Sequence, residues 1–273
     1  MENLLLIFEN ISSVNRALII VSGITIFWLI EGIVPFKFLD YKKWRHSIPN
    51  FLLTLTTIIV NFFFAFLLVF AADWTNENNF GVIHLVNSST LVSVILGLLV
   101  LDLIGAYLPH LVQHKVKLLW YIHIVHHTDH NVDTTTANRH HPFESVVRFV
   151  FTFIGIFISG APIGLVLMYQ SISVIASQFN HANIQISNKV DKLLSYIIVS
   201  PNMHKVHHHF ELPYTDSNYG NIFSIWDRLF GTYMELNKEK IVYGVDTDLD
   251  EVQNSTFTSL IKRPFKKWFN HFN

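Results

Sequence analysis

Long apolar runs alternate with short polar segments along the first part of this chain. Residues 17–36 are apolar apart from Glu31, residues 47–72 carry no charge, and residues 80–101 contain no Asp, Glu, Lys or Arg. An α-helix rises 1.5 Å per residue, so a run of about 20 residues crosses the ~30 Å hydrocarbon layer of a bilayer. The pattern therefore predicts three membrane-spanning helices.

A fourth run, residues 149–180, is uncharged but has an unsuitable length for simple spans. It is too long for one upright crossing and short for two, each of which needs about 20 residues. Gly160-Ala-Pro162 interrupts it, and proline and glycine are the residues at which a helix can end and the chain reverse. We expect a helical hairpin that crosses the membrane fully or partly.

The charges between the runs predict an orientation. Basic residues follow the first and third runs, whereas the segment after the second run is acidic. By the positive-inside rule, the basic segments are cytoplasmic, and the hairpin then returns the chain to that face. We expect an integral membrane protein, of the inner membrane if it is bacterial, with residues 110–141 and 181–209 on the cytoplasmic side. The charged residues are Lys37, Lys42, Lys43 and Arg45, then Asp73 and Glu77, then Lys115 and Lys117.

Composition supports a membrane protein and excludes several other classes. Hydrophobic residues make up 51% of the 273 residues and charged residues only 14%, against about 25% in soluble domains. The net charge of -1 gives no basic field for nucleic acid. The absence of cysteine excludes disulfides, thiolate metal sites and iron–sulfur clusters.

Histidine is the residue whose abundance indicates chemistry. The chain has 16 His, and three motifs place them on single helix faces, at i, i+4 or at i, i+3, i+4. Imidazole is the commonest protein metal ligand, and such spacing lets two rings reach one ion. The motifs supply eight rings and His181 a ninth, too many for one ion and suitable for two with an open position. The motifs are His110-x-x-x-His114, His123-x-x-His126-His127 and His204-x-x-His207-His208.

Other metal-site types fit less well. No HExxH sequence is present, so a zinc protease would lack its general base. The sequence also contains no Glu-x-x-His pair, the motif that is typical of a carboxylate-bridged di-iron bundle. We interpret His46, His84 and His271 as structural. The remaining histidines, His130, His140 and His209, flank the motifs. We expect them mainly to contact the ligand histidines from outside or to face solvent.

The order of motifs HxxxH, HxxHH, RxHPxE, NHxNI and HxxHH resembles the fatty acid hydroxylase/sterol desaturase superfamily. The stretches at 126–129, 134–139, 215–220 and 226–233 are similar to its bacterial members, and the resemblance covers roughly residues 95–235. It implies an integral membrane enzyme with a histidine-rich di-iron centre. Such an enzyme hydroxylates or desaturates a lipid, such as a sterol or fatty acyl chain, using O2 and electrons from a separate electron-transfer protein.

The resemblance also implies a set of metal ligands. Nine histidines match ligand positions, and His141 matches the HP histidine, as a tenth ligand or an outer contact. Zinc binds imidazole sites more tightly than iron does, so zinc could replace the two iron ions in purified protein. The implied ligands are His110, His114, His123, His126, His127, His141, His181, His204, His207 and His208.

Several residues around the ligands are candidates for supporting roles. We expect Glu144, Asp129, Asp133 or Asp227 to accept ring N–H bonds from ligand histidines, or else to act as caps and surface charges. Asp227, Asn218 and Tyr219 are the candidate catalytic residues, and Asn218, Tyr219 and Trp226 are candidates to close the site. The family commonly has an Asp seven residues before the first motif histidine. Here Asp102 is eight before His110, so we expect a shifted helix register.

The predicted fold is an all-α polytopic membrane bundle with a cytoplasmic-face, histidine-rich di-metal cap. Residues 1–109 form N-terminal transmembrane helices, residues 95–235 a catalytic domain that includes the hairpin, and residues 236–273 a polar tail. The basic and aromatic end of the tail, residues 261–269, is either a solvated end or a membrane-surface anchor. The alternative function is a histidine-rich metal transporter or a metal-binding protein without oxygenase activity.

Overall fold

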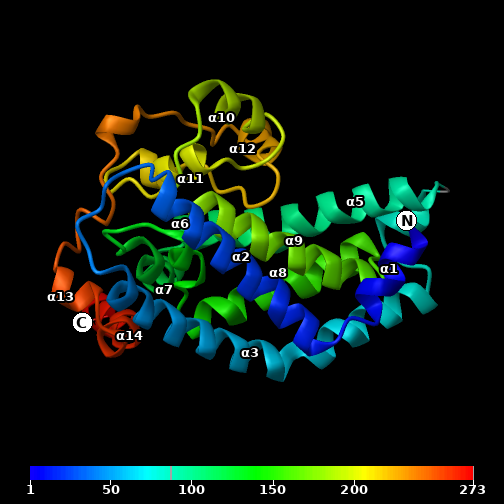
Figure 1. Cartoon of the computed structure of the whole chain (residues 1–273). Coiled ribbons are helices and arrows are strands. Elements are labelled where there is room, and N and C mark those ends of the chain that lie inside the picture. The colour runs from blue at the N-terminus through cyan, green and yellow to red at the C-terminus, as the bar shows by residue number, and fades with distance from the viewer. Residues whose placement is uncertain (87, 273) are drawn as a thin grey trace.

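The computed structural model describes residues 1–86 and 88–272, and the regular elements in these residues are helices, which confirms the all-α prediction (Figure 1). Long helices lie beside one another and form the body of the molecule. Within this body α3 packs on α8, and α9 packs on α2 and α5. The long helices are α2 (Ser13–Ile33), α3 (Lys43–Glu77), α5 (Thr90–Asp102), α8 (Pro142–Ser159) and α9 (Ile163–His181).

Four stretches of the described residues are long and apolar enough to cross a membrane, namely Ser13–Ile33, Lys43–Leu85, Thr90–Lys115 and Pro142–Ser159. The outer face of α3 exposes large apolar side chains that would be unfavourable in water; Phe62, for example, is 77% exposed. The surface of these helices is therefore suited to lipid. The α9 helix is not among these four stretches, and it buries polar side chains such as Gln178 and Asn180 inside the bundle.

Two of the predicted spans differ in extent from the observed helices. The α3 helix has 35 residues, roughly 50 Å, and so is longer than the predicted run and than the hydrocarbon layer. The third run is divided between a short helix, α4 (Val82–Leu85), and α5, which begins at Thr90. The span then continues beyond the predicted end, through a π-helix, Leu103–Tyr107, into α6 (Leu108–Lys115).

The π-helix accounts for the unusual spacing between Asp102 and His110. A π-turn holds one residue more than an α-turn, so it absorbs the extra residue that the sequence carries at this point. Asp102 is fully buried, and its carboxylate accepts hydrogen bonds from the backbone N–H of Phe223 (3.1 Å) and from the indole N–H of Trp226 (3.0 Å). The expected register shift is therefore present, and Asp102 anchors the loop that follows α11.

The chain reverses between α8 and α9 at the stretch where the sequence predicts a hairpin. Gly160 ends α8 in the left-handed conformation (φ 72°), and Pro162 is the N-cap of α9. A Cβ atom on Gly160 would lie 2.4 Å from the carbonyl oxygen of Phe80, so only glycine fits against the end of α3. The reversal brings the end of α9 back to the end of the bundle that holds α6.

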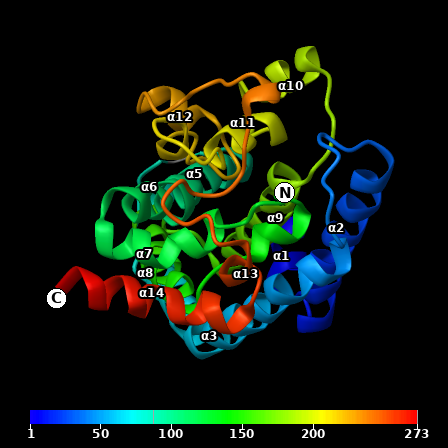
Figure 2. The same cartoon turned by 90° about the vertical axis from the view of Figure 1, so that its left-hand side faces the viewer.

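Short helices cover this end of the bundle, whereas α1 (Glu2–Glu9) and the N-terminus lie at the opposite end (Figure 1). Figure 2 is a view onto the covered end. Short 3-10 turns connect several of the helices, at Thr134–Asn138, Tyr214–Asp216 and Lys238–Lys240. The covering helices are α7 (Lys117–His127), α10 (Asn188–Leu194), α11 (Pro201–His207), α12 (Ile225–Leu229), α13 (Glu251–Asn254) and α14 (Phe257–Phe272).

The C-terminal segment is part of this packing and is not a free, solvated end. Leu260 of α14 is fully buried against Leu53 and Val125, and the indole N–H of Trp268 donates to the carbonyl oxygen of Leu118 (3.0 Å). The opposite face of α14 exposes Phe269. The predicted polar tail thus closes the covered end of the bundle beside α3 and α7.

The arrangement predicts which segments share a side of the membrane. Single cysteines at Lys117, Ser187 and Asn237, introduced into a chain without native cysteine, should react with an impermeant maleimide from one side, which we expect to be the cytoplasm. A cysteine at Asn76, at the far end of α3, should react only from the other side. Labelling of Ser187→Cys and Asn76→Cys from the same side would contradict the bundle described here.

Candidate metal centre

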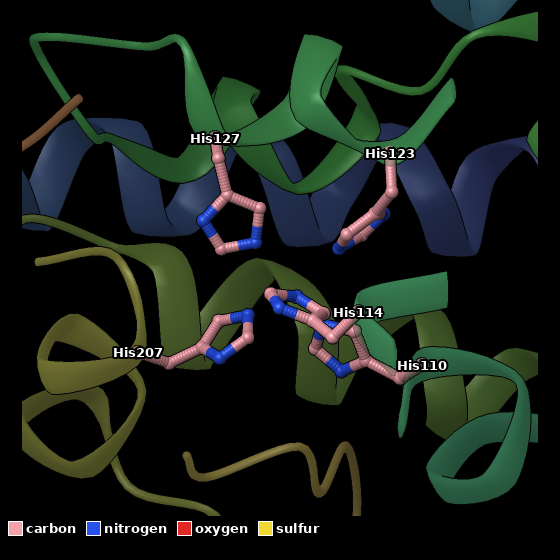
Figure 3. Close-up of side chains that lie close together, drawn as sticks. All are labelled: His110, His114, His123, His127 and His207. Atoms are coloured by element: carbon pink, nitrogen blue, oxygen red, sulfur yellow. The ribbon is translucent and has the colours of Figure 1, made fainter. Parts of the chain in front are cut away.

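Five histidine rings converge at the covered end of the bundle (Figure 3). His110 and His114 lie one turn apart on α6, His123 and His127 lie one turn apart on α7, and His207 comes from α11. One ring nitrogen from each residue lies within 4.8 Å of those of the other four. The two sequence motifs of α6 and α7 thus face each other, and α11 closes the group.

A second group of four rings lies beside the first. The Nε2 atom of His181, at the end of α9, is 3.1 Å from Nε2 of His126, 3.0 Å from that of His204 and 3.2 Å from that of His208. All four residues are buried. The hairpin is what brings His181 to this position.

Each HxxHH motif contributes to both groups. On α7, His123 and His127 belong to the first group and His126 to the second. The α11 motif is divided the opposite way, with His207 in the first group and His204 and His208 in the second. Positions i and i+4 share a helix face, whereas the i+3 ring projects to one side of it, so one short helix can serve two adjacent centres.

The nitrogen atoms fit a pair of metal ions. A neutral imidazole donates one hydrogen bond, so Nε2 of His181 cannot bond three facing ring nitrogens at once. In the first group, Nε2 of His110, His114 and His207 is buried and has no hydrogen-bond partner. Ligands about 2.0–2.1 Å from one ion are roughly 2.9–3.4 Å apart, so the spacing of the second group is one that a shared cation would fit.

The surroundings keep these rings in the form that binds metal. Burial, and then the neighbouring imidazoles, lower the pKa of His126, His127, His204 and His208 well below the usual range. The rings are therefore neutral near pH 7, and each retains a nitrogen lone pair.

Carbonyl oxygens and carboxylates lie against the second nitrogen of several rings. The Nδ1–H groups of His110 and His207 donate to the carbonyl oxygens of Tyr219 (2.8 Å) and Ser217 (2.6 Å), and Nδ1 of His114 lies 3.2 Å from Oδ1 of Asp216. Such contacts fix the tautomer and aim Nε2 into the group. In the same way, Nδ1 of His181 bonds to the carbonyl oxygen of Ser177 (2.7 Å).

The residues proposed as catalytic from sequence organise the loop that supplies these carbonyls. The carboxylate of Asp227 accepts hydrogen bonds from the backbone N–H of Tyr219 (2.7 Å) and Gly220 (2.9 Å), and burial raises its pKa to about 6. The side-chain amide of Asn218 (φ 52°) donates hydrogen bonds to the carbonyl oxygens of Met203, in α11, and of Met234, both 2.9 Å away. It therefore links α11 to the segment around Met234. Neither side chain contacts a ligand histidine in the described residues.

Tyr219, in contrast, lies directly over the first group. Its ring centroid is 5.1 Å from that of His114 and 5.5 Å from that of His110. The side chain is fully buried, and it therefore separates the first group from the loops outside.

The structure gives His141 and two of the candidate carboxylates other surroundings. His141 is outside both groups: its Nδ1 accepts from the N–H of Phe143 (3.2 Å), and Nε2 bonds to the carbonyl oxygen of Ile261 (3.1 Å). Both nitrogens are thus used in capping α8 and holding α14. Asp129 and Asp133 face His46, whose ring lies 2.8 and 3.2 Å from them, and not a ligand ring.

Glu144 and His140 form a third cluster beside the first group. One carboxylate oxygen of Glu144 lies 3.1 Å from Nδ1 of His123 and 2.9 Å from Nδ1 of His140. The expected contact between Glu144 and one of the motif histidines is therefore present. His140 was not among the predicted site residues, although it immediately precedes the HP histidine and stacks on His126, with ring centroids 4.6 Å apart.

The histidines interpreted as structural lie away from these groups. His84 bonds to the carbonyl oxygen of Gly160 at the opposite end (3.2 Å), and His271 packs on Tyr121. His130 contacts the side-chain amide of Asn254, and His209 accepts from the N–H of Val242.

Two cavities meet at the histidine groups. A small cavity of about 30 Å³ is lined by rings of both groups, including His110, His123 and His181. A larger one of about 570 Å³ extends between α2, α3, α8 and α9. His140, Arg148 and Ser177 line both cavities, so they mark the junction.

Fold and site together define an α-helical protein with helices suited to a membrane and a buried histidine-rich metal-binding centre at one end. The sequence pattern of the fatty acid hydroxylase family matches residues 94–232, about half of the chain. The chain belongs to this family, as its motifs predicted.

Several named proteins are similar to part of this chain. Ornithine lipid hydroxylase OlsE of Rhizobium tropici is 27% identical over 140 residues, covering 51% of this chain and 41% of the relative. Alkylglycerol monooxygenase of Homo sapiens is 27% identical over 172 residues (61% and 34%), and that of Xenopus tropicalis 30% over 146 residues (52% and 30%). The matched segments span less than half of each relative. No solved structure matches the chain significantly.

Removing one ring from either group should remove metal. We expect His127→Ala and His208→Ala each to lower the metal content of gently purified, iron-supplemented protein from about two ions per chain, as measured by elemental analysis. His84→Ala and His271→Ala are the matched controls and should retain the wild-type content. Loss of metal from all four variants, or at most one ion in the fully loaded wild type, would contradict a two-ion centre.

Asp227 should matter through the loop that it holds. In Asp227→Asn, the side-chain NH2 group replaces one carboxylate oxygen, so one backbone N–H loses its acceptor. Leaving this buried donor unsatisfied costs about 1–3 kcal/mol of folding free energy. Because the Tyr219 carbonyl then loses its fixed position, metal affinity should fall about 10-fold or more, measured by chelator competition. Asp73→Asn, an exposed change at the far end, serves as control; equal affinities for both variants would exclude this role.

Proposed function

We propose that the protein is a membrane-bound, O2-dependent hydroxylase of a lipid. The observation that carries this proposal is the junction of the long cavity with the histidine centre. A chain entering between α2, α3, α8 and α9 would meet the small cavity at His140 and Ser177. A cavity open to the lipid-facing helices and ending at a metal centre is suited to a substrate that arrives from the bilayer.

The nine converging rings would hold two iron ions. Five ligands in one group and four in the other leave room for a small molecule, and the small cavity lies between them. Bound iron would supply the redox chemistry that an unactivated C–H bond requires and that acid–base side chains lack. Tyr219 and the loop held by Asp227 would exclude water from this side of the centre.

A hydroxylation replaces C–H by C–OH with one oxygen atom of O2 and reduces the other atom to water, using two electrons and two protons. The chain has no cysteine for an iron–sulfur cluster, so we infer a separate electron-transfer protein that docks at the covered end, on the cytoplasmic face. Hydroxylation is favoured over desaturation because the relatives are a lipid hydroxylase and monooxygenases by name.

A metal transporter is the alternative. Transport sites usually lie near the middle of the spans, among polar groups that face a pathway. Here the rings are gathered at one end of the bundle, which favours a fixed centre over a relay.

Lipid profiling under isotopically heavy O2 tests the proposal. Cells with the wild-type protein should contain a lipid that has gained one heavy oxygen atom, and cells with His127→Ala should lack it at equal membrane abundance. A metal-loaded protein that yields no oxygenated lipid with a competent reductant would favour the non-oxygenase alternative. A desaturated lipid without heavy oxygen would instead indicate the second reaction type of the family.

A further inference from the structure

Arg148 has an unusual position for a charged residue. It lies in α8, one of the stretches suited to cross a membrane, and lines both the small and the large cavity. Its side chain is 37% exposed although it lies inside the bundle. A charged residue within such a helix is costly and usually has a specific partner.

The protein supplies little to match this charge. The nearest carboxylate oxygen, on Glu144, is 3.9 Å from Nη1 of Arg148, and the same oxygen is already shared by His123 and His140. No hydrogen bond from the Arg148 guanidinium is present within residues 1–86 and 88–272. A guanidinium has five N–H donors in a planar fork that suits carboxylate or phosphate oxygens. Because Arg148 lines both cavities and its side chain is 37% exposed, these donors are available to an anionic group of a ligand.

The lining of the large cavity is consistent with a polar lipid head group at the end where Arg148 lies. Near Arg148 the wall contains polar side chains such as Thr57, Asn61 and Ser145, whereas farther along it contains Leu68 and Leu167. Ile163 and Ser177 both line it and are fourteen residues apart on α9, so the cavity extends over about four helical turns.

A second arginine lines the opposite end but is better satisfied. Nη2 of Arg16 donates to the side-chain oxygen of Gln170 (3.2 Å), and the acidic Glu9 lines the same end of the cavity. An anionic head would meet repulsion from Glu9 there. Glu144 places a carboxylate near Arg148 as well, but its oxygen also faces His123 and His140, and the Arg148 guanidinium makes no hydrogen bond within the described residues. The availability of these donors favours the Arg148 end for an anion.

We propose that Arg148 binds the acidic oxygen atoms of a lipid carboxylate or phosphate head, so that the chain extends toward Leu68 and Leu167 and a carbon close to the head faces the centre. This deepens the proposed function and rests on it for the reaction. That head-proximal C–H becomes C–OH with one atom of O2, while the external reductant and two protons convert the other atom to water.

Photo-crosslinking tests the orientation without any turnover. Metal-loaded wild-type protein in nanodiscs is irradiated with palmitate that carries a diazirine either beside the carboxylate or near the methyl end, and the adducts are mapped by mass spectrometry. The head-proximal probe should label peptides around residues 138–148, and the methyl-end probe should label residues 163–171. The reverse pattern, or no adduct in the cavity, would overturn the proposal even if the protein proves to be a hydroxylase.

Variants then test the charge. Arg148→Gln should reduce head-proximal labelling at least about 10-fold, Arg148→Lys should restore part of it, and Arg45→Gln, an exposed arginine at the start of α3, should not change it. Palmitate methyl ester should label weakly, whereas a diazirine-bearing alkyl phosphate compared with the acid identifies which anion is preferred. Equal labelling by the ester, or a greater loss in Arg16→Gln than in Arg148→Gln, would show that the head is not held by Arg148.

Discussion

Nine imidazoles whose ring nitrogens face one another, at one end of a helical bundle, are the constraint on which the rest of this structure depends. Each ring can point inward only if its other nitrogen or its helix is held from outside. The carbonyl oxygens of Ser177, Ser217 and Tyr219 provide this for three rings, and Arg139 bonds to the carbonyl oxygen of Val125 near the end of α7 (2.9 Å). The loops around the centre are thus as necessary as the ligands themselves.

The bundle brings together two motifs that lie far apart in the sequence. The two HxxHH motifs are 81 residues apart, yet their rings interleave between two groups. The α8–α9 reversal returns the chain to its starting end, and buried polar links then fix the register of α11. Lys205, between two ligand residues, is fully buried and donates to the carbonyl oxygen of Ala182 (2.7 Å), beside His181. At the other side, Glu31 accepts from the backbone N–H of Asn183 (2.7 Å).

Much of this was predictable because helix periodicity and motif spacing are local properties. The all-helical fold, the reversal at Gly160 and the nine converging rings follow from runs, breakers and i, i+4 patterns. The outer contacts do not, because backbone carbonyls have no sequence signature. Asp129 and Asp133, expected beside ligand rings or as caps and surface charges, face His46 instead, a contact that depends on the packing of α3. The separate roles of His140 and His141 depend on the start of α8, which places His141 at the N-cap. The packing of α14 required tertiary contacts that no local pattern encodes.

The π-helix at Leu103–Tyr107 has a consequence for how such proteins diverge. Seven residues make almost two α-helical turns, whereas eight would rotate His110 by roughly 80° away from the face of Asp102. The widened turn absorbs the added residue, so both side chains keep their partners. A helix can therefore accommodate one added residue at this position without turning His110 away from the centre. A search that requires an interval of seven residues between the aspartate and the histidine would miss this chain, although the chain belongs to the family.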